Sequence, residues 1–186
     1  MRHGALAVDG YRLMRAALGG AAGFLLFFVA RGIALLTALD AASPVPLAGG
    51  SLDAADMAVL VGVVLPLIVA AAGLVAWTMG AGWPARWLAG LLALAPAAVC
   101  VYAGRSNYSP FNRFETQAFL LPVLMAVLVV TAGRRPPAAA GGAVLAWGAC
   151  TILVQVSPAQ GLPIAALGWL LIPAIAAGLE EASTRA

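Results

Sequence analysis

The sequence contains few side chains suited to acid–base or ligand chemistry. Among its 186 residues there is no lysine, one histidine and two cysteines, and charged residues make up 9%. The histidine, His3, precedes every hydrophobic run, so a haem or metal site within those runs would lack imidazole ligands. Cys100 and Cys150 lie within hydrophobic runs, where a thiol usually packs as a small apolar group. We therefore expect no metal and no cofactor.

Catalytic motifs are also missing. The sequence has no glycine-rich phosphate loop, no Walker motif, and no Ser-His, Cys-His or paired-carboxylate constellation in its hydrophobic runs. No Asp, Glu or Lys lies inside the cores of the predicted spans, which excludes a proton relay of intramembrane carboxylates. The arginines are scattered and do not form the dense basic patch of a nucleic-acid binder. These absences disfavour an enzyme and exclude nucleic acid from the expected partners.

Long hydrophobic runs dominate what is present. Hydrophobic residues make up 63% of the chain, whereas a soluble domain carries roughly 25% charged residues. A run of about 18 apolar residues is long enough to cross the hydrocarbon core of a bilayer. The segment 16–39 contains one charge, Arg31, and four longer or similar segments contain none: 57–85, 87–104, 116–133 and 136–179. The chain is therefore predicted to be an integral membrane protein.

We predict an all-α, polytopic bundle of six transmembrane helices. The run 136–179 is too long for one span and is divided at 157–163, where proline and glycine break the helix. Six spans and their short connections account for residues 1–186, so the chain forms a single integral membrane domain. The spans are expected at roughly 16–39, 57–79, 84–103, 116–132, 138–156 and 162–179.

The arginines predict the orientation, because cytoplasmic loops carry an excess of basic residues. With the N-terminus inside, the outer segments hold only Arg105 and Arg113, and the inner segments hold Arg2, Arg12, Arg15, Arg86, Arg134, Arg135 and Arg185. Trp83 and Trp87 then fall at the inner edge of the membrane, as interfacial aromatic residues do. The use of Arg in place of Lys, with abundant Ala, Gly and Pro, indicates a GC-rich bacterial coding bias. We expect a multi-pass protein of the bacterial cytoplasmic (inner) membrane with both termini inside.

Small residues and prolines recur within the spans. Small side chains let membrane helices approach closely, and Gly19, Gly20 and Gly23 form such a pattern near the inner end of the first span. Prolines at positions 66, 96, 122 and 173 each remove a backbone donor and tend to kink the helix.

Arg31 is the exception to the charge pattern. A charge within a span costs a few kcal/mol at least and is by default a functional hypothesis. In one interpretation Arg31 faces a cavity and holds a carboxylate, a phosphate or a lipid head group. In the other it reaches the outer surface or pairs with an acid such as Asp56 or Glu115. The sequence leaves both open.

The segment 105–115 is the densest polar and aromatic stretch of the chain. Three interpretations are open: the segment caps a cavity, docks a partner protein, or forms an ordinary interfacial turn. Docking is considered because Tyr and Arg are enriched at interface hot spots. Gln117 and Gln155 fall at similar depth and predict a polar cluster at the outer mouth of the bundle. The candidate ligand or partner contacts are Arg31, Arg105, Asn107, Tyr108, Arg113, Glu115, Gln117 and Gln155.

Three function classes follow, none identified by a motif, and the residue inventory least favours a membrane enzyme that acts on lipid. The other two are more strongly supported. The first is a non-catalytic membrane subunit or accessory factor of a larger inner-membrane complex, with lipids and other membrane subunits as partners. The second is a small transporter or substrate-capture component that binds an anionic or zwitterionic solute from outside. A six-helix bundle of this size, with small residues on the first helix and a polar outer mouth, resembles the substrate-binding subunits of energy-coupling-factor vitamin transporters. That resemblance concerns size and span count, and a likeness of fold does not define function.

Overall fold

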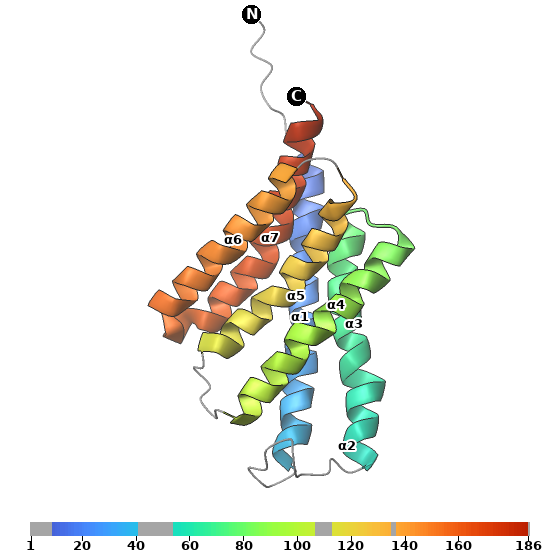
Figure 1. Cartoon of the computed structure of the whole chain (residues 1–186), viewed down its shortest axis with the longest axis vertical. Coiled ribbons are helices and arrows are strands. Elements are labelled where there is room, and N and C mark those ends of the chain that lie inside the picture. The colour runs from blue at the N-terminus through green and yellow to red at the C-terminus, as the bar shows by residue number, and fades with distance from the viewer. Residues whose placement is uncertain (1–8, 41–53, 107–112, 135–136, 186) are drawn as a thin grey trace, which may run out of the picture.

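The computed structural model describes residues 9–40, 54–106, 113–134 and 137–185, and these residues form helices and short connections without a strand (Figure 1). The predicted all-α fold is confirmed for this part of the chain. The elements are α1 (Gly10–Asp40), α2 (Ala54–Val59), the π-helical segment η1 (Leu60–Val64), α3 (Leu65–Thr78), α4 (Trp83–Ser106), α5 (Arg113–Ala132), α6 (Pro137–Val156), the 3-10 turn η2 (Pro158–Gln160) and α7 (Gly161–Thr184).

The helices run alternately up and down through the bundle. Helix α1 packs between α3 and α7, α5 contacts α4, α6 and α7, and α6 lies at the edge against α5 and α7. Helix α1 begins and α7 ends at the same end of the bundle, where α3 also turns into α4 (Figure 1). We call this the terminal end and the opposite one the far end. The helix break predicted at 157–163 is present as η2, although α7 resumes already at Gly161.

Four of the described helices are long and apolar enough to cross a membrane: Gly10–Ala34, Met57–Thr78, Pro137–Val156 and Pro158–Thr184. A shorter apolar helix covers Thr116–Ala132. Large hydrophobic side chains such as Leu25, Val61 and Leu145 point outward on these helices. Outward apolar side chains suit a lipid environment and not water. These features support the predicted membrane protein.

Glycines allow α1 to approach its neighbours closely. A Cβ added to Gly20 would overlap the backbone carbonyl of Trp169 on α7, and one added to Gly19 would overlap Thr78 at the end of α3. Hydrophobicity does not draw helices together in lipid, so such close contacts carry the packing. The small residues predicted to serve helix packing in the first span lie at these contacts.

An aromatic cluster fills the centre of the bundle. The indole of Trp169 is fully buried at 0% exposure, and its Nε1 donates a hydrogen bond to the carbonyl of Phe119. The ring of Phe27 lies edge-on to Phe119, with centroids 5.2 Å apart, and 5.6 Å from the Trp169 ring. Edge-to-face pairs add stabilisation beyond the area they bury. Trp169 therefore belongs to the packed core of α1, α5 and α7.

The predicted proline kinks include a specific distortion before Pro66. The ring of a proline clashes with the carbonyl four residues earlier, here Gly62. The helix widens into η1 at this point, and Leu65 donates its N–H to the carbonyl of Leu60, five residues back. A π-type turn absorbs the missing hydrogen bond without breaking the helix.

Replacing Gly20 with alanine is expected to lower the free energy of unfolding by about 1–3 kcal/mol, the usual cost of overpacking a filled interior. The added methyl group meets the carbonyl of Trp169, which is backbone and cannot rotate away. Thermal unfolding in mild detergent, followed by circular dichroism, measures the effect. Gly141→Ala on α6 is the matched control, because nothing lies within 4 Å of its added Cβ. Equal melting temperatures for the two variants would contradict the close packing of α1 on α7.

Candidate functional site

Helix α7 continues to Thr184, beyond the end predicted at Leu179. The extension carries Glu180 and Glu181, which are 5% and 6% exposed. Acidic side chains are almost never fully buried unless they are paired. The last turns of α7 thus bring two carboxylates into the bundle at its terminal end.

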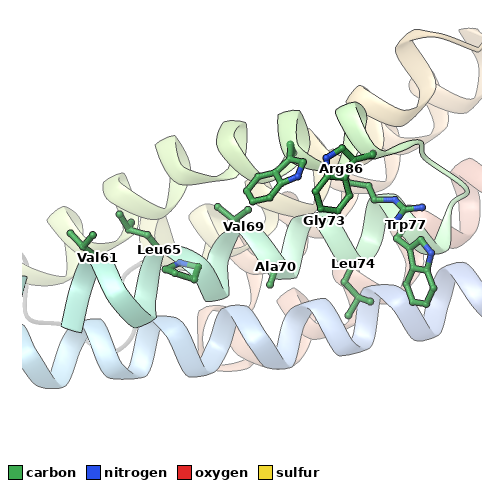
Figure 2. Close-up of a pocket in the computed structure, with 11 residues that line it drawn as sticks. Val61, Leu65, Val69, Ala70, Gly73, Leu74, Trp77 and Arg86 are labelled. Carbon is green, nitrogen blue, oxygen red and sulfur yellow. The ribbon is translucent and has the colours of Figure 1, made fainter. Parts of the chain in front are cut away.

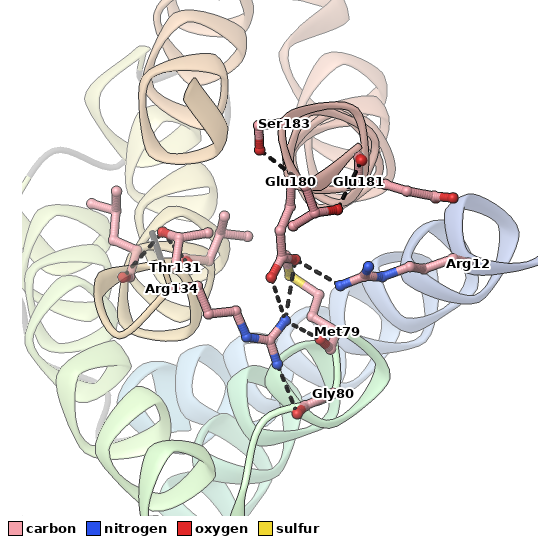
Figure 3. Close-up of polar contacts among 11 residues, drawn as sticks. Arg12, Met79, Gly80, Thr131, Arg134, Glu180, Glu181 and Ser183 are labelled. Carbon is pink, nitrogen blue, oxygen red and sulfur yellow. Dashed lines mark hydrogen bonds and ion pairs between the residues drawn. The ribbon is translucent and has the colours of Figure 1, made fainter. Parts of the chain in front are cut away.

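Glu180 accepts hydrogen bonds from arginines on two other segments (Figure 3). Its Oε2 lies 2.8 Å from Nη2 of Arg12 in the first turns of α1, and its Oε1 lies 2.9 Å from Nη1 of Arg134, just after α5. Charge-assisted hydrogen bonds are roughly twice as strong as neutral ones. Two guanidinium groups therefore compensate one buried carboxylate. We call Arg12, Met79, Gly80, Arg134 and Glu180 the Glu180 cluster.

Arg134 also binds the turn between α3 and α4. Its Nη1 donates to the carbonyl of Met79 at 3.0 Å and its Nη2 to that of Gly80 at 2.9 Å (Figure 3). This turn ends α3 with Gly80 at a φ of +86°, and the N–H of Ala81 returns to the carbonyl of Ala76. That is the Schellman arrangement, in which glycine adopts the left-handed conformation at lowest cost. A cation at a helix C-terminus also complements the helix dipole.

Glu181 secures the start of α1. Its Oε1 accepts the backbone N–H of Asp9 at 3.0 Å and pairs with Arg185, the residue that follows α7. Asp9 is the N-cap of α1, because its Oδ1 accepts the N–H of Tyr11. The Oε2 of Glu181 is buried and accepts no hydrogen bond from the described residues. One carboxylate thus joins the beginning of the first helix to the end of the last.

The Glu180 cluster acts as a clamp between distant segments of the chain. Its members come from α1, the α3–α4 turn, the segment after α5, and α7. Both oxygens of Glu180 and both Nη atoms of Arg134 are occupied by one another or by carbonyls. Among the described residues, no group of three or more His, Cys, Asp or Glu is placed to hold a metal ion. The arrangement fixes four segments relative to one another.

Sequence reasoning missed this clamp. The last predicted span ends at 179, before Glu180, and Arg12 and Arg134 enter the sequence prediction only as positive charges on the inner side. The signal was helical spacing: Pro173, Ala176 and Glu180 lie three and four residues apart on α7, and all three are buried. A carboxylate that continues a buried helical stripe predicts an ion pair inside the bundle.

The predicted cluster at the outer mouth falls partly outside the described residues. Asn107 and Tyr108 lie outside them, and the side chains of Arg105, Arg113 and Glu115 are likewise not described. Gln117 on α5 and Gln155 on α6 are half-buried. Their roles as ligand or partner contacts stay predictions.

Arg31 is half-buried in α1, and its guanidinium carbon lies 5.0 Å from the centroid of the Phe119 ring. Contact with an aromatic face stabilises a cation by about 0.5–2 kcal/mol, more as water is removed. Phe119 in turn contacts Phe27 and Trp169 of the central aromatic cluster. The structure therefore gives Arg31 a packing contact that neither interpretation of the sequence anticipated.

Replacing Glu180 with glutamine is expected to destabilise the protein by about 2–3 kcal/mol, less than a fully buried pair would lose because both arginines are partly in solvent. The side chains of Arg12 and Arg134 are 36% and 29% exposed. Thermal unfolding in mild detergent gives the difference. The control is Arg185→Gln, which breaks the local ion pair with Glu181 at the end of α7 and leaves the ion pairs of Glu180 in place. A loss for Glu180→Gln no larger than for the control would contradict the clamp.

Comparison of the chain with protein-family models, with curated proteins and with solved structures gives no match. No family therefore assigns a role to the clamp or to Arg31. The function has to be argued from the geometry of the described residues.

Proposed function

We propose that the protein is a non-catalytic subunit or accessory factor of a larger bacterial inner-membrane complex, with six spans and both termini in the cytoplasm. The orientation is supported by the basic residues gathered at the terminal end. Arg12 and Arg134 lie in the Glu180 cluster there, and Arg86 follows the α3–α4 turn at the same end. Basic residues concentrate on the cytoplasmic side of membrane proteins.

A structural role is favoured by the way the bundle is held together. Carriers alternate between two arrangements of their helices around a central site. Here the Glu180 cluster joins α1, α3, α5 and α7 at one end. Glycine contacts hold α1 against α3 and α7 further along. Both features oppose a rocking motion of these helices and suit a scaffold of fixed shape.

The outward face of α6 is the observation that carries the proposal. Of the candidate spans, α6 has the smallest buried share, 22%. Its outer face combines large side chains, such as Leu145 at 76% and Val156 at 75% exposure, with Gly141 and Gly148. A Cβ at either glycine would meet nothing within 4 Å.

Glycine on a lipid-exposed helix face gives no contact within the chain. It also costs roughly 0.5–1 kcal/mol in helix stability relative to alanine. Small residues gain value in a membrane when another helix packs over them. We therefore assign the α6 face, from Gly141 to Val156, to docking a transmembrane helix of another subunit.

The double variant Gly141→Leu/Gly148→Leu is expected to reduce co-purification of partner subunits about tenfold, the equivalent of about 1.4 kcal/mol of binding energy. The two leucines would hold a partner helix away from α6 without contact to the rest of the bundle. Quantitative mass spectrometry of the protein isolated in gentle detergent from its native membrane gives the measurement.

Ala95→Leu on α4 is the matched control, because Ala95 is also exposed but lies on a different helix. Its partner recovery should equal that of the unmodified protein. Equal recovery for all three proteins would remove α6 as the docking face. A monodisperse monomer without stoichiometric partners would overturn the subunit proposal itself.

Solute capture from the outer side is the second candidate. It is supported by Arg31, a half-buried cation within the apolar helix α1. In that case Arg31→Gln would abolish uptake of an anionic or zwitterionic solute into liposomes, because the charge that holds the solute is lost. Melting temperature is measured alongside, since the contact with Phe119 is lost too. Uptake that is absent in the unmodified protein, or that survives in the folded variant, would exclude this candidate.

A further inference from the structure

An apolar groove runs along the outside of α3 and α4 (Figure 2). It has a volume of about 570 Å³ and is lined from one end to the other by Val61, Leu65, Val69, Gly73 and Trp77, with Trp87 from α4. From Leu65 to Trp77 the groove follows α3 for about 18 Å at 1.5 Å per residue. Half of a bilayer's hydrocarbon core is about 15 Å thick. The groove therefore has the length of one acyl chain.

Tryptophans and arginines gather at the end of the groove nearest the terminal end. Trp77 lies where α3 ends, and Trp83 and Trp87 lie in the first turns of α4 with ring centroids 5.4 Å apart. Figure 2 shows Trp77 and Arg86 at the same end of the groove, away from Val61. Tryptophan is enriched at the membrane–water interface, where its ring meets lipid head groups. The mouth of the groove thus lies at head-group depth.

Two guanidinium groups converge on Trp77 at this mouth. The guanidinium carbon of Arg15 lies 5.7 Å from the centroid of the Trp77 ring, and that of Arg86 lies 6.0 Å from it. The Nε of Arg86 donates to the carbonyl of Ala81 at 2.8 Å, which orients the guanidinium. Among the described residues its Nη groups have no hydrogen-bond acceptor, so they can bind another group.

These two arginines differ from the others at the same end. Arg12 and Arg134 each form an ion pair with Glu180, whose single carboxylate they share. Within the described part of the chain, neither Arg15 nor Arg86 has a carboxylate partner. Two cations beside the same ring repel each other, and an anion bound near both would offset that repulsion. Arginine also matches the geometry of phosphate oxygens.

We propose that this groove binds an anionic phospholipid of the surrounding bilayer, with an acyl chain along α3 and the phosphate held by Arg15 and Arg86 beside Trp77. The apolar walls take the chain, the tryptophans lie at head-group depth, and the two cations supply the charge selectivity. A transmembrane helix of a partner protein would fill the apolar part but leave both cations without a counter-ion. The lipid assignment does not depend on the docking face of α6, which is a different surface.

Native mass spectrometry of the purified protein, exchanged against phosphatidylglycerol or phosphatidylcholine with the same acyl chains, tests the proposal. The unmodified protein should retain phosphatidylglycerol about tenfold more strongly, as two arginines near an anionic head group imply. Inorganic phosphate should not displace it, because phosphate has no acyl chain to fill the groove. Equal retention of the two lipids, or displacement by inorganic phosphate, would overturn the proposal.

Variants separate the head-group contact from the chain contact. Arg15→Gln/Arg86→Gln should remove the preference for phosphatidylglycerol while leaving weak binding of both lipids. Gly73→Leu should weaken both lipids alike, because a Cβ at Gly73 meets only the carbonyl of Arg86 at 3.6 Å and the longer side chain then enters the groove. Ala70→Leu, at another exposed groove position, serves if Gly73→Leu does not fold.

Ala95→Leu is the control, because Ala95 is exposed on α4 but does not line the groove. Its lipid retention should match that of the unmodified protein. The melting temperature of each variant in detergent shows whether it is folded, and lipid retention is compared among the folded variants. Unchanged lipid retention in folded double-arginine and groove-filling variants would refute the site. A partner protein crosslinked through Gly73→Cys, in place of lipid, would do so as well.

Discussion

The carboxylate of Glu180 is the constraint on which the terminal end of the bundle depends. An isolated charge in an apolar interior costs far more than any single helix contact returns, so Glu180 requires compensation in the folded protein. Arg12 and Arg134 provide it from two segments far apart in the chain. Because Arg134 also holds the carbonyls of Met79 and Gly80, the same interaction positions the turn between α3 and α4.

Close backbone contact complements the ion pairs along the rest of the bundle. Gly19 and Gly20 let α1 meet Thr78 and the carbonyl of Trp169. This places Phe27 against Phe119 and Trp169 at the centre. Arg31 then has an aromatic ring to lie over within an apolar helix. The polar exception in α1 is thus accommodated by the packing that the small residues of the same helix allow.

The helices were predictable because hydrophobic length is a local property of the sequence. Each observed helix lies within a few residues of an expected range, except that α1 begins earlier, at Gly10, and α7 ends later, at Thr184. Those ends differ because the predicted spans leave out the charged residues Arg12 and Glu180, which the structure includes in α1 and α7. Their pairing depends on how α1, α5 and α7 are arranged in space, which no single segment encodes. The contact of Arg31 with Phe119 and the groove beside Val69 depend on helix register in the same way.

Glycine serves different purposes on α1 and α6, depending on whether another helix of the same chain contacts it. At Gly20 the missing side chain makes room for the backbone carbonyl of Trp169 on α7. At Gly148 the same absence leaves open space on a face that already exposes large apolar side chains. A lipid chain fills such a notch as readily as it covers an alanine, so lipid alone gives glycine no advantage there. A helix of another protein that packed on α6 would gain from glycine at position 148, because the two backbones could approach closely. The proposed α6 contact would thus follow the same small-residue packing that brings α1 close to α7.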